Sequence, residues 1–197
     1  MRQQVLGQFE HQSPCSDRSL ELCFNVSAQP CSHDWQKNHL NSTFMADYAG
    51  QVASDLIPDI SPHLSAINDT INFVANELLE HAMICRDGTS DREIRIVVRV
   101  SDTNIRLYIK NRVDANSVDI LTDKLTSILS GDPAARYIQY LQAGFESTEE
   151  YFRYLSMMVD HKVDIAWKIE HADNTAKDTW VTTMTRVPIQ QSQKYPN

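Results

Sequence analysis

Two pairs of strand-like segments, each joined by a polar turn, constrain the fold of this chain most strongly. Residues 94–100 and 105–109 are rich in β-branched side chains and lie close together in the sequence, which is typical of a β-hairpin. Residues 163–169 and 179–187 repeat this pattern around a polar turn at 171–177. Helical stretches precede each pair, so the sequence predicts an α/β (α+β) sandwich, with helices packed on one face of a mixed, mainly antiparallel sheet.

The segment before the first strand pair is predicted to form one strand and two helices. Residues 20–26 alternate apolar and polar side chains, as a half-buried strand does. The first helix is expected to begin at Ser42, a good N-cap residue, and to end before Pro58. The second begins at Ser61 and carries a broad apolar stripe to about Ile84.

Two further helices, at 114–130 and 132–160, are predicted between the strand pairs. Gly131 separates them, and Gly144 with Ser147 suggests another break in the second helix. The resulting organisation is a loose or disordered arm at 1–16, a strand-and-helix extension packed on the core at 17–60, the main domain at 61–189 and a frayed tail at 190–197.

The charge and hydropathy of the chain exclude several classes of function. The formal net charge is −8, and the Lys and Arg residues are scattered along the sequence, so we expect no nucleic-acid partner. No apolar run reaches the length of about 18 residues that spans a bilayer, and residues 1–10 lack the apolar core of a signal peptide. We therefore expect a cytoplasmic protein with no membrane partner.

The four cysteines, Cys15, Cys23, Cys31 and Cys85, are expected to be reduced thiols in that compartment. The alternative is a zinc site that uses Cys31, His33 and another thiol, but the paired Cys-x-x-Cys spacing of zinc sites is missing. The sequence therefore predicts no metal site.

The segment 76–82, Asn-Glu-Leu-Leu-Glu-His-Ala, is the most informative about function. Glu77 and His81 are four positions apart, so they project from the same face of a helix. A second polar line on this helix comprises Asn68, Asn72, Asn76 and Glu80. One interpretation is a solvated helix face with a stabilising Glu–His pair. The other is a functional site.

Residues 77–82 resemble the E-L-x-x-N-A motif of histidine-kinase-like ATPases. In that family the Glu is a general base or positions a water, and the Asn holds a magnesium ion. The resemblance implies Glu77 as the catalytic base and puts His81 at the position of the magnesium ligand. A neutral imidazole is a poor ligand for magnesium, which prefers oxygen, so the metal role does not carry over.

Further parts of the family pattern follow in the right order. Residues 111–115 stand where the family has a D-x-G-x-G loop, with Asn111 in the place of the adenine-reading Asp and Val113 in that of a glycine. The Gly-rich phosphate lid is missing from 147–160, and 180–189 resemble the terminal G-T-T strand. The cofactor-binding set implied by the resemblance is Asn76, His81, Asn111 and Thr183.

The resemblance covers residues 64–189 and is nearest to bacterial anti-sigma-factor serine kinases and their uncharacterised relatives. Those proteins dimerise and phosphorylate a STAS-domain partner. The favoured hypothesis is a partner-switching regulator that binds such a protein partner and a second copy of itself, with weak or no ATP turnover. The alternative is an active serine/threonine kinase that uses ATP and magnesium, and a third hypothesis is a small-molecule sensor in the vacated nucleotide pocket.

All three hypotheses depend on one spatial arrangement. The helix that bears Glu77 must lie across a sheet that includes 94–109 and 179–187, with its acidic face turned toward a shared hollow.

Overall fold

Six strands form one antiparallel sheet in the computed structural model, which describes residues 2–11, 18–25, 34–58, 60–84, 93–114, 118–143, 149–171 and 179–189. The strands are β1 (Arg2–Leu6), β2 (Ser19–Asn25), β3 (Glu93–Val100), β4 (Asn104–Val113), β5 (Asp164–His171) and β6 (Thr179–Pro188). Their order across the sheet is β1-β5-β6-β4-β3-β2. The helices of this part of the chain are α1 (Asp34–Leu56), α2 (Leu64–Ile84), α3 (Val118–Leu129), α4 (Pro133–Ala143) and α5 (Glu149–Val159), with a 3-10 turn (Ser61–His63) leading into α2.

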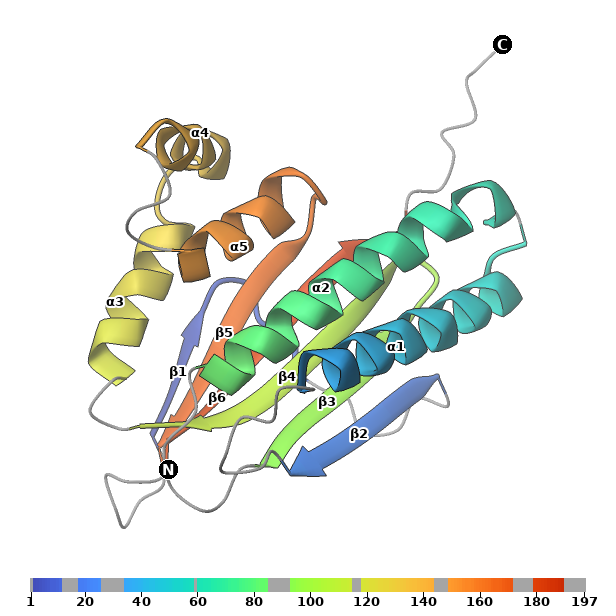
Figure 1. Ribbon diagram of the computed structural model, residues 1–197, viewed down its shortest axis with the longest axis horizontal. Helices are drawn as coiled ribbons and strands as arrows, with labels where there is room; N and C mark the ends of the chain where they lie inside the picture. Colours follow the sequence, from blue (N-terminus) through green and yellow to red (C-terminus); the bar gives the residue numbers. More distant parts are fainter. Residues whose placement is uncertain are drawn as a thin grey trace.

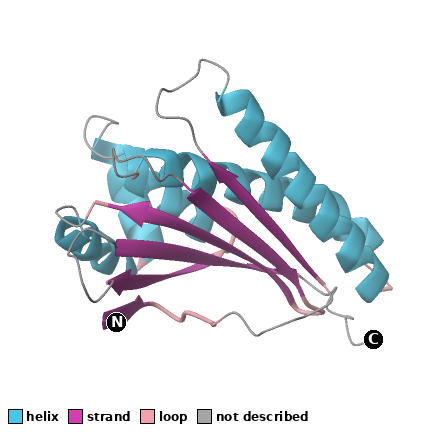
Figure 2. Cartoon of the chain, turned by 90° about the horizontal axis from the view of Figure 1, so that it is seen from below, coloured by secondary structure: helices cyan, strands magenta, loops and turns pink. Residues whose placement is uncertain are grey.

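The helices cover one face of the sheet, and the opposite face carries none of them (Figures 1 and 2). The main core lies between the two layers and includes Ile71, Leu79, Leu107 and Trp167, all of them buried. A smaller buried cluster lies on the face without helices and comprises Val97, Tyr108, Ala166 and Met184. The predicted sandwich, with helices on one side of a sheet, is therefore confirmed.

The sheet is not mixed, because every strand pairing in the described part of the chain is antiparallel. Both predicted hairpins, β3–β4 and β5–β6, are present. β5 runs parallel to β4, but β6 lies between them and pairs with both in the antiparallel sense. The long connection through α3, α4 and α5 therefore creates no parallel neighbours.

Helix α1 begins earlier than predicted. Ser42 is not an N-cap: it is buried within the helix, which starts at Asp34, and its hydroxyl donates a hydrogen bond to the carbonyl of His39 at 2.9 Å. Among the residues of α1 whose side chains the structure describes, from His39 onward, the buried apolar positions run from Met45 to Ala53 and follow Ser42. The apolar stripe therefore signals only the second part of the helix. Its end at Leu56, before Pro58, agrees with the prediction.

The first residues of the chain belong to the sheet. β1 pairs with β5 from Arg2 opposite His171 to Leu6 opposite Trp167, so the prediction of a loose arm at 1–16 is wrong for this strand. The side chains of β1 are exposed except for the half-buried Leu6, and for that reason the strand has no apolar alternation.

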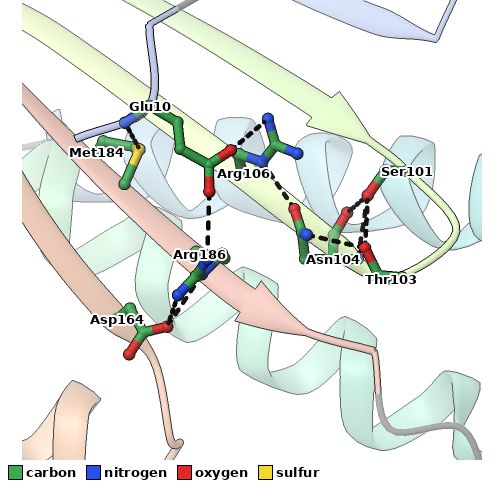
Figure 3. A network of polar contacts seen from close by, with 8 residues as sticks. All are labelled: Glu10, Ser101, Thr103, Asn104, Arg106, Asp164, Met184 and Arg186. Atoms are coloured by element: carbon green, nitrogen blue, oxygen red, sulfur yellow. Dashed lines mark hydrogen bonds and ion pairs between the residues drawn. The ribbon is translucent and has the colours of Figure 1, made fainter. Parts of the chain in front are cut away.

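Residues 7–11, which we name the crossing segment, pass over the face without helices. Gly7 has a φ of +78°, and a Cβ atom on it would lie 3.1 Å from the carbonyl oxygen of Ile165, so the turn requires glycine. The carboxylate of Glu10 lies between Arg106 of β4, at 2.9 Å, and Arg186 of β6, at 3.2 Å (Figure 3). These ion pairs fix the segment across the two central strands.

The described part of the interval between the strand pairs holds three helices. Gly131, with a φ of +87°, follows the first of them as predicted, and α4 and α5 lie on the two sides of the break expected in the helix at 132–160. The expected break at Gly144 and Ser147 lies outside the described residues, as do the tail at 190–197 and the proposed zinc ligands Cys31 and His33. Of the helices that the structure describes, none combines the length and apolar character of a membrane span.

Candidate functional site

Helix α2 lies across the sheet on its helical side and contacts β4 and β6 (Figure 1). Its buried stripe, which includes Ile71, Val74 and Leu78, packs into the main core. The segments 94–109 and 179–187 belong to the same sheet. Glu77 projects from the flank of α2 that faces α5, and its side chain is only 17% exposed. The helix and the strands are therefore arranged as the three hypotheses require, but the acidic face of α2 is turned toward Arg153 of α5 and not toward a shared hollow.

An arginine of α5 holds the two carboxylates on this flank. Arg153 donates a hydrogen bond from Nη1 to Glu77 Oε2 at 2.9 Å and also contacts Glu80. Asn76 donates from Nδ2 to Glu80 Oε1 at 3.0 Å. Burial raises the pKa of Glu77, the charge of Arg153 opposes that rise, and Glu80 adds to it. The carboxylate of Glu77 is thus engaged in an ion pair, which competes with the role of a base that accepts a proton.

The next turn of α2 is covered by an aromatic residue of α5. The hydroxyl of Tyr154 lies 3.0 Å from His81 Nδ1, and the two rings meet edge to face at 5.0 Å. The Tyr154 ring also stands at 90° to the ring of Trp167 on β5, at 5.2 Å. Burial lowers the pKa of His81 to about 4, with a further lowering by the charge of Arg153. His81 is therefore a neutral imidazole at pH 7.

Asn111 and Thr183 face α2 from the sheet. The resemblance predicts a loop at 111–115, but residues 111–113 continue β4 and pair with β6, so that Asn111 lies opposite Val181 and Val113 opposite Thr179. Valine suits this extended backbone, which does not need the positive φ of a loop glycine. The amide of Asn111 is buried and donates to the carbonyl of Arg112 at 3.4 Å.

Three of the predicted site residues line one small cavity. His81, Asn111 and Thr183 meet there, and the apolar walls come from Leu121 of α3 and Trp167 of β5. The cavity has a volume of about 10 Å³. That is room for at most about one water molecule. Glu77 and Asn76 are not part of its lining and instead pair with Arg153 and Glu80.

These residues do not fit ATP with magnesium. Sites for small molecules usually have volumes of about 300–1,000 Å³, whereas side chains from α3, α5 and β5 occupy the space around His81. Magnesium prefers oxygen ligands, and the described residues hold no cluster of three or more His, Cys, Asp and Glu side chains that would surround a metal ion. A sensor that binds its ligand in the vacated pocket meets the same lack of space.

Arg153 is the residue beside the candidate site that the sequence did not reveal. Its partners Glu77 and Glu80 lie more than seventy positions earlier, and no local pattern links them. The neighbouring Tyr154 and Met157 were predicted to be core residues from their helical spacing, and their burial confirms this. The local sequence around a single charged residue does not indicate which residues of another helix it will contact.

Comparison with protein-family models, with curated proteins and with solved structures finds no match for this chain. What is established is a mixed α/β fold with a six-stranded antiparallel sheet and five helices in its described part.

Proposed function

We propose that this chain is a bacterial signalling regulator of the partner-switching type. It binds a STAS-domain-like protein through a degenerate histidine-kinase-like domain, with weak or no ATP turnover, and it forms a homodimer. The observation that supports this proposal best is the packing of α5 on α2, because Arg153 and Tyr154 contact Glu77 and His81, the positions that the resemblance assigns to the base and the magnesium ligand. If a kinase-like domain does not turn over ATP, binding to other proteins is the function that it can still perform.

Exposed apolar side chains on α4 offer a surface for such a partner. Ile138 and Leu141 are three positions apart on one helix face and are 52% and 47% exposed. Tyr140 lies between them in sequence and is 39% exposed. Large apolar side chains grouped on a surface often mark a protein-interaction site. We name Ile138 and Leu141, which share this helix face, the α4 patch.

Titration calorimetry with purified STAS-domain proteins tests the proposal. We expect one of them to bind in the absence of nucleotide, and we expect sedimentation equilibrium of the chain alone to give the mass of a dimer. Absence of binding to any STAS-domain protein, together with a monomer at tens of micromolar, would refute both parts.

Replacement of Leu141 by aspartate is expected to weaken partner binding by at least about tenfold, because a charge would have to be buried in an apolar contact. The matched control is Gln142→Asp, which introduces the same charge at the neighbouring exposed position of α4. Both variants should unfold at the wild-type temperature. If the two variants bound the partner with equal affinity, the partner would bind somewhere other than the α4 patch.

One observation favours the alternative of an active serine/threonine kinase. Glu77 is present on α2 with a pKa raised by burial, as the base of such an enzyme requires. This function needs α5 to move, so that Arg153 releases the carboxylate. Transfer of radiolabelled γ-phosphate from Mg-ATP to a bound STAS-domain protein tests it, and label that is lost in Glu77→Gln would establish the kinase.

A further inference from the structure

The face of the sheet without helices gathers basic side chains that are scattered in the sequence. Alternate residues of a strand point to the same face, so basic residues that are far apart in the sequence come together here. The cations on this face are Arg95, Arg99, Arg106, Lys110, Arg112, Lys168 and Arg186. The chain as a whole has a formal charge of −8. This face therefore differs in charge from the rest of the molecule.

Most of these cations lie in ion pairs with a neighbouring carboxylate. Arg106 and Arg186 pair with Glu10, and Arg186 also pairs with Asp164 at 2.6 Å (Figure 3). Arg95 pairs with Glu21 at 2.6 Å. An extended polyanion such as a nucleic acid would have to displace these carboxylates along the whole face. The pairing favours a local site for a small anionic group.

Such a site lies beside the crossing segment, in a pocket of about 210 Å³. Its polar lining comprises His11, Arg95, Tyr108, Lys110, Lys168 and Thr182, and Phe9 forms an apolar wall. All of these polar side chains are able to donate hydrogen bonds, and no carboxylate belongs to the lining. A lining of donors suits a group that only accepts, such as an oxyanion.

Two buried hydroxyls in this lining lack the partners that such groups normally have. The side chain of Thr182 is 3% exposed, and its Oγ1 atom has no hydrogen-bond partner. The hydroxyl of Tyr108 is also buried, with Arg106 near it but no hydrogen bond of normal geometry. A buried polar atom without a partner is costly, and a ligand that accepts from it removes that cost.

The two lysines of the pocket share one carboxylate. Lys110 lies 3.2 Å and Lys168 3.1 Å from oxygens of Glu170. One negative charge therefore serves two ammonium groups, which leaves positive charge at the pocket. The aromatic rings of Trp180 and Phe9 lie near these ammonium groups, at 5.2 Å from Lys110 and 5.8 Å from Lys168. These contacts hold the lysines at the edge of the pocket.

We propose that this pocket binds a phosphate group, held by Lys110, Lys168 and the hydroxyl of Thr182, three residues of its lining. The volume admits the group itself but not a whole nucleotide, because drug-sized ligands need about 300 Å³ or more. The phosphate group belongs either to a free ion or to a phosphorylated side chain of another protein, and the chemistry of recognition is the same for both.

Calorimetry and two-dimensional NMR of the full chain at low ionic strength test the proposal. The probes are inorganic phosphate, a phosphoserine peptide, the same peptide without phosphate, and a single-stranded oligonucleotide. We expect saturable binding of phosphate or of the phosphopeptide, with amide shifts in β4, β5 and β6. Binding of phosphate alone identifies a free ion, and preference for the phosphopeptide identifies a protein source.

Variants tie the binding to the named side chains. Lys168→Met is expected to weaken binding about tenfold, since a charge-assisted hydrogen bond is lost. Thr182→Val should weaken binding severalfold while leaving the melting temperature unchanged or higher, because it removes a buried hydroxyl that has no partner. Lys124→Met, at an exposed position of α3, is the charge control and should bind as the wild type does. Absence of binding, equal binding by Lys168→Met and the wild type, or preference for the oligonucleotide would overturn the proposal.

Discussion

Replacement of Tyr154 by alanine is expected to lower the free energy of unfolding by about 3–5 kcal/mol. Tyr154 is 1% exposed and contacts both His81 and Trp167, so its removal leaves a cavity between α5, α2 and the sheet. β5 is hydrogen-bonded to β1 on one side and to β6 on the other, so its backbone cannot shift enough to close the cavity completely. Urea denaturation followed by circular dichroism measures the loss.

Two control variants separate the parts of this effect. Tyr154→Phe keeps the ring and loses the hydroxyl, which lies 3.0 Å from His81 Nδ1, so it should cost about 1 kcal/mol. Tyr140→Ala removes the same side chain at an exposed position of α4 and should change stability by less than about 0.5 kcal/mol. If Tyr154→Ala were as mild as Tyr140→Ala, α5 would not be packed on α2.

Acidification is expected to remove about 3 kcal/mol of stability through His81 alone. The pKa of His81 is about 4 in the folded protein and about 6.5 in the unfolded chain, and each pKa unit corresponds to about 1.4 kcal/mol. Between these two values the unfolded chain binds a proton that the folded protein does not bind. The contribution is therefore fully present above about pH 6.5, is lost progressively as the pH falls toward 4, and levels off below it.

Comparison with His81→Gln isolates this contribution from that of Glu77. The raised pKa of Glu77 acts in the opposite direction, since the folded protein then binds a proton more readily than the unfolded chain does. The wild type should lose about 3 kcal/mol more than the variant between pH 6.5 and pH 4. NMR titration of the His81 ring gives its pKa directly. A value near 6.5 for the folded protein would contradict the burial of this imidazole.

Strong local periodicity made the sheet and most helices predictable from the sequence. The local sequence alone predicts which residues are buried in five elements. These are the strands β3, β4, β5 and β6, through their β-branched residues, and the helix α2, through its apolar stripe. β1 and the first part of α1 were missed because their side chains give no apolar period. β1 is held instead by backbone pairing with β5, which no local pattern records.

The predicted site residues lie on α2, β4 and β6, but the sequence did not predict which side chains of α5 would contact them. The sequence placed Glu77 and His81 on one face of α2, and it placed Thr183 on the closing strand. It gave no indication that Arg153 and Tyr154 would cover this face, because such a contact depends on how a separate helix packs. The positive charge on the face without helices was not predicted either. Side chains alternate between the two faces along each strand, so cations that are dispersed in the sequence come together on one face.

Thermal unfolding with and without millimolar Mg-ATP tests most directly the claim that side chains fill the region that the resemblance assigns to a nucleotide. The melting temperature is expected to be the same under both conditions, because the cavity at His81 and Asn111 has a volume of only about 10 Å³. A ligand at a hundred times its dissociation constant would stabilise the fold by about 2.7 kcal/mol. A rise of that size in the wild type, abolished in Asn111→Ala, would show that α5 yields the site to ATP and would contradict the account.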